Sequence, residues 1–152
     1  MISSLVATLM VASFITALGP QAKPRPPADA NQRVTVYRVK TCGCCGKWAE
    51  HVKAAGFDVA IKVVDDVARV EGRNRVPEEL RTCHVAFVGP YVVEGHVPAD
   101  VIKDLLRRRP AIDGIAVPGM PKGSPGMESP TPQPYDVIAF DKKGTTTTFA
   151  RR

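Results

Sequence analysis

The chain has 152 residues, 44% of them hydrophobic and 24% charged, which is enough for one domain with a buried core. Its formal net charge of +6 raises the question of nucleic-acid binding. The basic residues are scattered, however, and no aromatic side chains alternate with them as a base-stacking surface requires. The run from Arg107 to Arg109 lies at the end of a predicted helix, where cations complement the helix dipole. We therefore expect no nucleic-acid partner.

Residues 1–22 contain an apolar run, from Ile2 to Leu18, that predicts a secretory signal peptide. No Lys or Arg precedes this run, and its length is close to the ~17–25 residues that span a membrane, so an uncleaved N-terminal anchor is the alternative. We expect export, with membrane attachment only if this segment is retained. Residues 23–33 are rich in Pro and Ala and predict a linker, and residues 34–152 form the predicted folded domain.

The first half of the domain is predicted to alternate strands and helices. Trp48, Val52 and Ala55 recur at helical spacing and indicate a helix over 45–55, which Gly56 can end. The other expected elements are a strand over 34–40, a strand over 58–64, a short helical segment near Val67 and one turn over 77–80.

The second half is predicted to hold two hairpins, one helix and one irregular segment. They are a hairpin pairing 85–88 with 91–94, an amphipathic helix between Pro98 and Pro110, the irregular segment 118–134 and a hairpin pairing 135–140 with 145–149. Six prolines and three glycines exclude regular structure from 118–134. This order of elements predicts an α/β, thioredoxin-like (glutaredoxin-like) domain with a Pro/Gly/Met-rich loop and a C-terminal β-hairpin.

All four cysteines lie in two short pieces, Cys42-Gly43-Cys44-Cys45 and Cys83-His84. Three thiols within four residues make a poor disulfide framework, because adjacent cysteines cannot pair without strain. Thiolates do select soft ions such as Cu(I), Zn(II) or the iron of iron–sulfur clusters. A helix N-terminus favours the thiolate form, which a metal ligand must adopt. The first piece therefore predicts a metal-binding loop.

The second piece belongs to a longer match. Residues 82–89, Thr-Cys-His-Val-Ala-Phe-Val-Gly, resemble the glutaredoxin stretch Thr-Val-Pro-x-Val-Phe-Ile-Gly. In that family the proline is cis and its loop lies directly over the active cysteines. Cys83 and His84 stand in the positions of the valine and that proline. The resemblance implies that Cys83 lies beside the first three cysteines and adds a fourth sulfur donor.

Charge constrains the metal that Cys42, Cys44, Cys45 and Cys83 would bind. A single Cu(I) ion on four thiolates leaves most of the negative charge uncompensated, which is costly in a partly dry site, so we expect more than one copper ion per chain. Zinc is the alternative, although zinc sites made of four cysteines usually take two from each of two loops. An iron–sulfur cluster would be unstable in an oxidising compartment. A disulfide, Cys42–Cys45 or Cys42–Cys83, is the remaining interpretation and leaves Cys44 without a role.

Five further residues carry soft or borderline donor atoms. Met120 and Met127 each occur as Pro-Gly-Met, and a thioether suits Cu(I) far better than zinc. His84 can reach the site only where the backbone is irregular, because neighbouring strand residues point to opposite faces. We assign these three as auxiliary donors. His51 is displaced by about 10 Å along the predicted helix and is expected to be a surface residue. His96 is expected to be structural or to support a ligand.

Four segments carry a resemblance to a known family: TCGCCGKW (41–48), TCHVAFVG (82–89), VEGHVPADVI (93–102) and AVPGMPKGSPGME (116–128). From residue 34 to 150 the chain resembles the CopG-like family of exported copper-binding proteins, long known only as a domain of unknown function. The resemblance implies a thioredoxin-like fold, a cysteine-bound Cu(I) site, a role in bacterial copper tolerance and copper redox chemistry in the periplasm. The implied partners are copper ions and other periplasmic copper-handling proteins.

Three functions are therefore weighed. The leading hypothesis is a Cu(I)-binding protein with the four cysteines as ligands. The second is an enzyme, a copper or thiol–disulfide oxidoreductase, in which Cys42 is the nucleophile and Cys45 resolves the mixed disulfide. Cys44 argues against an ordinary thiol oxidoreductase, because it would compete for every mixed disulfide. The third is a structural zinc module. A Cys42–Cys45 disulfide coupled to the oxidation state of copper would join the first two hypotheses.

Overall fold

The computed structural model describes residues 32–152. The predicted signal peptide or anchor (1–22) lies outside the described residues, as does the predicted linker (23–33) apart from its last two positions. Within residues 32–152, no helix is long and apolar enough to cross a membrane.

Strands and helices alternate through most of the described chain. The strands are β1 (Arg33–Arg38), β2 (Asp58–Val63), β3 (His84–Val88), β4 (Tyr91–Gly95), β5 (Gly114–Val117), β6 (Asp136–Phe140) and β7 (Thr146–Arg151). The helices are α1 (Gly43–Ala54), α2 (Ala68–Arg73) and α3 (Ala99–Arg108), with a 3-10 turn, η2 (Glu78–Leu80).

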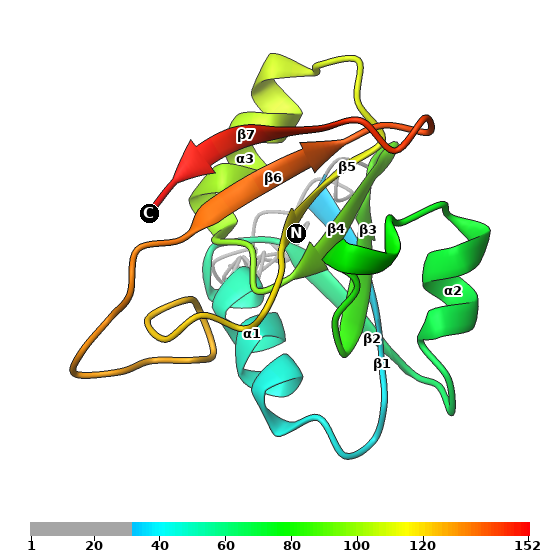
Figure 1. Cartoon of the computed structure of the whole chain (residues 1–152). Coiled ribbons are helices and arrows are strands. Elements are labelled where there is room, and N and C mark those ends of the chain that lie inside the picture. The colour runs from blue at the N-terminus through cyan, green and yellow to red at the C-terminus, as the bar shows by residue number, and fades with distance from the viewer. Residues whose placement is uncertain (1–31) are drawn as a thin grey trace, which may run out of the picture.

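The strands form one sheet in the order β2-β1-β3-β4-β5-β6-β7. The pairs β1–β2 and β4–β5 are parallel and the other four pairs are antiparallel. Helices α1 and α3 cover one face of the sheet, and α2 and η2 lie against the other face (Figure 1). The α/β prediction is confirmed, and the predicted C-terminal hairpin is the β6–β7 pair.

Helix α1 is held to the sheet by one apolar stripe. Cys45, Trp48, Ala49 and Val52 are buried at the spacing i, i+3, i+4 and i+7, which places them on a single face. The indole Nε1 of Trp48 also donates a hydrogen bond to the carbonyl oxygen of Val97, 2.8 Å away, in the segment between β4 and α3. The N-terminal half of α1 is therefore fixed against the sheet and the segment that follows β4.

Two features differ from the sequence-based expectation. Helix α1 begins at Gly43 rather than at Cys45, so that Cys42 is the residue before the helix and Cys44 lies in its first turn. Strand β5 was not predicted at all. It is only four residues long, entirely buried and parallel to β4, so it lacks the alternation of polar and apolar residues that marks a half-exposed strand.

Candidate metal centre

Three of the four cysteines gather at the N-terminus of α1. Cys42 immediately precedes the helix, Cys44 and Cys45 lie in the first turn, and no side chain caps that end. The first turn contains no acidic residue. Unpaired backbone N–H groups and the helix dipole therefore place partial positive charge beside the three sulfur atoms.

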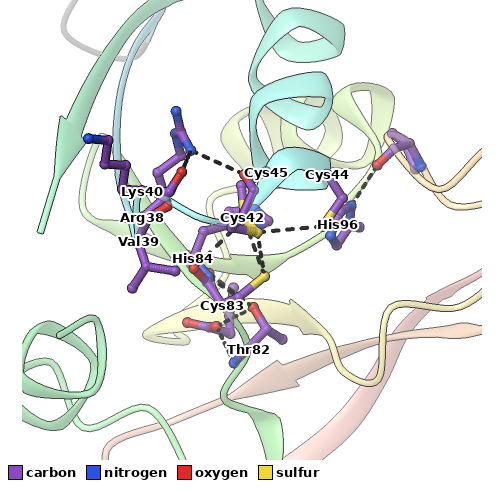
Figure 2. Close-up of a disulfide and its surroundings, with 12 residues drawn as sticks. Arg38, Val39, Lys40, Cys42, Cys44, Cys45, Thr82, Cys83, His84 and His96 are labelled. Atoms are coloured by element: carbon purple, nitrogen blue, oxygen red, sulfur yellow. Dashed lines mark hydrogen bonds between the residues drawn. A yellow bond between two sulfur atoms is a disulfide. The ribbon is translucent and has the colours of Figure 1, made fainter. Parts of the chain in front are cut away.

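The loop that leads to these cysteines is held by Arg38, the last residue of β1. Its Nη1 lies 3.2 Å from the carbonyl oxygen of Val39, 3.4 Å from that of Lys40 and 3.1 Å from that of Cys42, and donates to all three (Figure 2). One guanidinium group thus fixes the backbone on the approach to α1. It also adds a permanent positive charge at the same side of the site.

Cys83 approaches from a different segment, directly before β3. Its Sγ lies 2.8 Å from the Sγ of Cys42 and 3.2 Å from that of Cys45 (Figure 2). The Sγ of Cys44 lies 3.5 Å from that of Cys42. All four sulfur atoms lie within 4.8 Å of one another, a spacing that can hold a metal ion. Cys83 is therefore placed where the glutaredoxin resemblance predicts it.

Two of the four sulfurs are joined in the described state. Cys42 and Cys45 form a disulfide, with their Cα atoms 5.5 Å apart, and Cys44 and Cys83 are free. A disulfide sulfur carries no proton, so the thiol of Cys83 is the donor in its contacts with that pair. The Cys42–Cys45 disulfide that the sequence left as an alternative is thus present, within a cluster that also has the spacing of a metal site.

The thiol of Cys83 resists ionisation. Burial, followed by the nearby Cys44, raises the pKa of Cys83 to about 11. The group is therefore protonated at neutral pH in the metal-free chain. A metal ion that binds there must displace this proton, so that its affinity rises with pH.

Two histidines complete the group of donor atoms. His84 and His96 are fully buried, and each offers a ring nitrogen within 4.8 Å of the other and of the Cys83 sulfur. Burial and then the neighbouring His96 lower the pKa of His84 to about 3, and burial also lowers the pKa of His96. Both rings are therefore neutral at physiological pH, which is the form that binds metals. Sequence reasoning placed His84 near the site but assigned His96 only a supporting role.

The turn after β4 brings His96 inward. Gly95 has a φ of +69°, and a Cβ there would lie 2.5 Å from the carbonyl oxygen of Val117 and 3.0 Å from a methyl carbon of Thr82. Only glycine fits this crowded left-handed position. A Gly-His pair at the end of a strand is the one signal in the sequence that could have indicated an inward-turned histidine.

The Pro/Gly/Met-rich segment 118–134 covers this end of α1. Its Pro125 carbonyl oxygen lies 2.7 Å from Nδ1 of His96. Gly126 follows with a φ of +85°. A Cβ there would lie 2.8 Å from the Cys44 carbonyl oxygen and 2.9 Å from the backbone nitrogen of Trp48. The absence of a side chain at Gly126 lets the segment lie directly on the cysteine-bearing turn.

The two methionines of this segment lie in different surroundings. Met127 lines a surface pocket of about 570 Å³ together with Cys44 and Lys47. Met120 is 41% exposed. His51 accepts a hydrogen bond at Nε2 from the backbone N–H of Ala99, 3.2 Å away, and so satisfies a donor in the first turn of α3, which gives it a structural role.

A buried polar network behind Cys83 was missed entirely. Glu94 accepts hydrogen bonds at Oε1 from the backbone N–H and the hydroxyl of Thr82, both at 2.8 Å. The carboxyl group of Glu71 lies near enough to act on it electrostatically, and both side chains are buried. Burial, followed by the charge of Glu71, raises the pKa of Glu94 to about 9. Nothing in the sequence indicates that carboxylates so far apart would meet.

Comparison with known proteins gives a consistent result. A family model described as a protein of unknown function, DUF411, matches residues 80–127. No curated protein matches the chain significantly. A solved structure of copper resistance protein CopG, Form 1, is 39% identical and has a TM-score of 0.75, with 80% of this chain and 98% of that chain covered. Form 2 is also 39% identical and has a TM-score of 0.74, with 79% and 97% covered.

The match to CopG spans nearly the whole length of both CopG structures and about four fifths of this chain. The family predicted from the four sequence segments is confirmed: the chain belongs to the CopG family of copper resistance proteins.

Proposed function

We propose that the protein binds Cu(I) on Cys42, Cys44, Cys45 and Cys83 and serves copper tolerance. The observation that carries the proposal is the convergence of four sulfur atoms within 4.8 Å, from segments that are about forty positions apart in the chain. Thiolates are soft donors that select Cu(I). The copper resistance proteins to which the chain is similar support the choice of copper over zinc.

Binding by all four cysteines requires the Cys42–Cys45 disulfide to open. Its reduction takes two electrons and two protons and returns two thiols to the cluster. The N-terminus of α1 and the guanidinium of Arg38 then favour the thiolates that copper needs. Four thiolates exceed the charge of one Cu(I) ion, so the filled site holds more than one ion, bridged by the sulfurs.

The auxiliary donors differ in the support they receive. His84 is within reach of the Cys83 sulfur and has no hydrogen-bond partner on either ring nitrogen. Met127 lines the pocket beside Cys44, so its thioether is suited to pass Cu(I) between the surface and the cluster. Met120, which is exposed, would act only on copper arriving from solution.

A second function, copper oxidoreductase, is favoured by the disulfide itself. Cys42 and Cys45 in the dithiol form can give one electron each to two Cu(II) ions. The products are two Cu(I) ions, two protons and the Cys42–Cys45 disulfide, so atoms and electrons balance. Catalytic roles for Cys42 and Cys45 follow only in this case. An ordinary thiol–disulfide oxidoreductase is less favoured, because Cys83 and Cys44 both lie within 3.5 Å of Cys42 and would intercept mixed disulfides.

Fold detail and location are part of the same proposal. The strand order β2-β1-β3-β4, with α1 after β1 and α3 after β4, is the arrangement expected of a thioredoxin-like domain, to which β5, β6 and β7 add three strands. We also propose that the protein works in the periplasm after export, since a disulfide is stable in such a compartment. The mass of the chain recovered from a periplasmic extract tests whether residues 1–22 are removed.

The deciding experiment is an anaerobic Cu(I) titration of the reduced protein against a chromogenic Cu(I) chelator. Wild-type protein should withdraw more than one Cu(I) ion per chain. Cys42→Ala, Cys44→Ala, Cys45→Ala and Cys83→Ala should each lower the number of ions retained. Met120→Leu, at an exposed position, is the matched control and should retain the wild-type number.

A sharp end point at a single Cu(I) ion would contradict the multi-ion site. Protein purified with tightly bound zinc that copper does not displace would show that the third function, a structural zinc module, is the correct one.

A further inference from the structure

The closed disulfide changes which donors remain at the site. With Cys42 and Cys45 joined, only Cys44 and Cys83 keep free thiols. The four-sulfur cluster then keeps only two of its four thiolate donors. A second group, formed by Cys83, His84 and His96, contains neither disulfide cysteine and stays complete.

The hydrogen bonding of His96 leaves one ring nitrogen ready to bind a metal. Its Nδ1 lies 2.7 Å from the Pro125 carbonyl oxygen, and a carbonyl only accepts, so Nδ1 carries the proton. The lone pair is then on Nε2, which is buried and has no hydrogen-bond partner. A ring N–H that donates to a carbonyl while the other nitrogen is free is the usual arrangement of metal-binding histidines.

His84 lacks hydrogen-bond partners to a greater extent than His96. Both of its ring nitrogens are buried without a hydrogen-bond partner. The ring lies 4.6 Å from the Trp48 ring and 5.1 Å from the His96 ring, measured between centroids (Figure 2 shows the two histidines beside the cysteines). Buried polar atoms are nearly always satisfied in native proteins. Two neighbouring imidazoles with three unsatisfied nitrogens therefore point to a ligand between them and Cys83.

The chemistry of this set differs from that of the four cysteines. Two neutral imidazoles and one thiolate compensate the charge of a monovalent copper ion completely, which suits a buried position. Two histidines and one cysteine are also the equatorial donors of mononuclear copper sites that cycle between Cu(I) and Cu(II). A cluster of thiolates alone, in contrast, favours Cu(I) over Cu(II).

We propose that Cys83, His84 and His96 form a mononuclear copper site that remains competent when the Cys42–Cys45 disulfide is closed. The choice of copper rests on the proposed function, whereas the donor set rests on the geometry. Cys83 belongs to both groups. It is therefore a copper ligand both in the reduced four-cysteine cluster and in the Cys83–His84–His96 site that remains after the dithiol is oxidised. Oxidised protein thereby keeps one ion instead of releasing all of its copper.

The test uses the full-length protein with its disulfide closed, verified by mass spectrometry and by alkylation of two thiols only. Co(II) is the probe, because it does not exchange electrons with the disulfide and its thiolate complexes absorb strongly. We expect one Co(II) per chain, a thiolate-to-cobalt absorption band, and X-ray absorption that shows nitrogen and sulfur neighbours together. Added Cu(I) should abolish the band.

Variants separate this site from its alternatives. His84→Phe and His96→Phe should each weaken Co(II) binding at least tenfold, and Cys83→Ser should remove the absorption band. His51→Gln is the matched histidine control, since His51 lies on α1 and its side chain hydrogen-bonds only to the backbone N–H of Ala99 in the described part of the chain. If a buried phenylalanine perturbs folding, Cys42→Ser/Cys45→Ser offers a second route, because it removes the disulfide cysteines and should still bind one Co(II).

Three results would overturn the inference: no thiolate band with oxidised protein, a band that both histidine variants retain, or a band lost in Cys44→Ser. The last would mean that Cys44 and Cys83 bind the ion as a pair. The proposed function is tested separately. It is contradicted if the Cu(I) retained by reduced protein does not depend on the four cysteines. In that case a Co(II) site found in oxidised protein would still support the present inference.

Discussion

The geometry of Cys83 depends on a single buried acceptor. Oε1 of Glu94 receives both the backbone N–H and the hydroxyl of Thr82, the residue before Cys83. These two bonds fix the direction in which the chain enters β3, and hence the position of the Cys83 sulfur over the disulfide. Glu94 never contacts that sulfur through a hydrogen bond in the described structure, so it acts through the backbone.

Glu94→Leu and Glu94→Gln should therefore differ sharply. Leucine leaves the Thr82 N–H buried without a partner, which costs about 1–3 kcal/mol of unfolding free energy. Glutamine retains a carbonyl oxygen in the same place and should cost much less. Urea unfolding measures the difference, and Cu(I) titration should show weaker binding for the leucine variant. Equal destabilisation by the two substitutions would mean that the hydrogen bonds to Thr82 contribute nothing.

The same carboxyl group predicts how stability depends on pH. Burial, together with the charge of Glu71, raises the pKa of Glu94 from 4.5 to about 9 in the folded chain. The folded state then binds more protons than the unfolded state between these values. The free energy of unfolding should therefore fall as pH rises from about 5 towards 9. Metal-free oxidised protein should show this slope in urea unfolding, and Glu94→Gln should flatten it. Parallel curves for the two proteins would contradict the buried carboxyl pair.

At the residue scale, the sequence predicted the cysteines well and the other polar residues poorly. Cys42, Cys44 and Cys45 are informative because three thiols in four residues have few structural uses. Cys83 was placed through its match to a glutaredoxin loop. Glu71 could not be placed, because the carboxylate it meets is distant in the sequence. His96 was given only a supporting role, because the glycine turn that brings it inward was not recognised.

At the scale of elements, internal hydrogen bonds hold the irregular segment 118–134 in a defined backbone conformation. Gly123 and Met127 are joined by a backbone hydrogen bond of 2.8 Å, and the Ser124 hydroxyl donates to the Pro121 carbonyl oxygen at 2.7 Å. The segment therefore presents Pro125 and its neighbours to α1 in one conformation. Prolines reduce the entropy lost in ordering it.

Gly126→Ala should break this contact. Alanine would add strain at a φ of +85° and would push a Cβ to 2.8 Å from the Cys44 carbonyl oxygen. Gly119→Ala is the matched control in the same segment, with a φ of +75° and nothing within 4 Å of the added Cβ. Both carry the strain of about 1–3 kcal/mol for a left-handed residue. Only Gly126→Ala should also reduce metal binding, measured as Cu(I) retained by reduced protein. An equal effect of both would show that the segment does not cover the site.

Strand β5, which the sequence analysis missed, is a strand only because of the strands that pair with it. Strands with clear alternation and helices with clear periodicity were found within a few residues of their observed limits. Strand β5 has four apolar residues between a Pro110 turn and Pro118, a pattern that a loop or a buried strand can carry equally. Its identity depends on β4 and β6, which lie on either side of it.

At the scale of the molecule, the two edges of the sheet differ in character. Strand β7 exposes a row of threonines, whereas β2 exposes Ile61 and Val63, which are 47% and 56% accessible. An edge strand with apolar side chains is prone to pair with another copy.

Val63→Lys should therefore lower concentration-dependent association, measured by light scattering, and should change the unfolding free energy by no more than about 0.5 kcal/mol. Thr147→Lys on β7 is the control and should leave association as it is, because that edge is already polar. Association that both lysines reduce equally would indicate a general effect of charge.

The parallel pairing of β4 and β5 has a consequence for engineering. Parallel neighbours direct their carboxyl ends to a common rim, so the peptide that leaves β5 emerges next to the turn that follows β4. Residues 118–134 can therefore be exchanged as a cassette between two fixed anchor points, β5 and β6. Replacement segments with a different length or different metal-binding side chains should change the metal selectivity of the site. The disulfide pair and the sheet that supports it would keep their sequence.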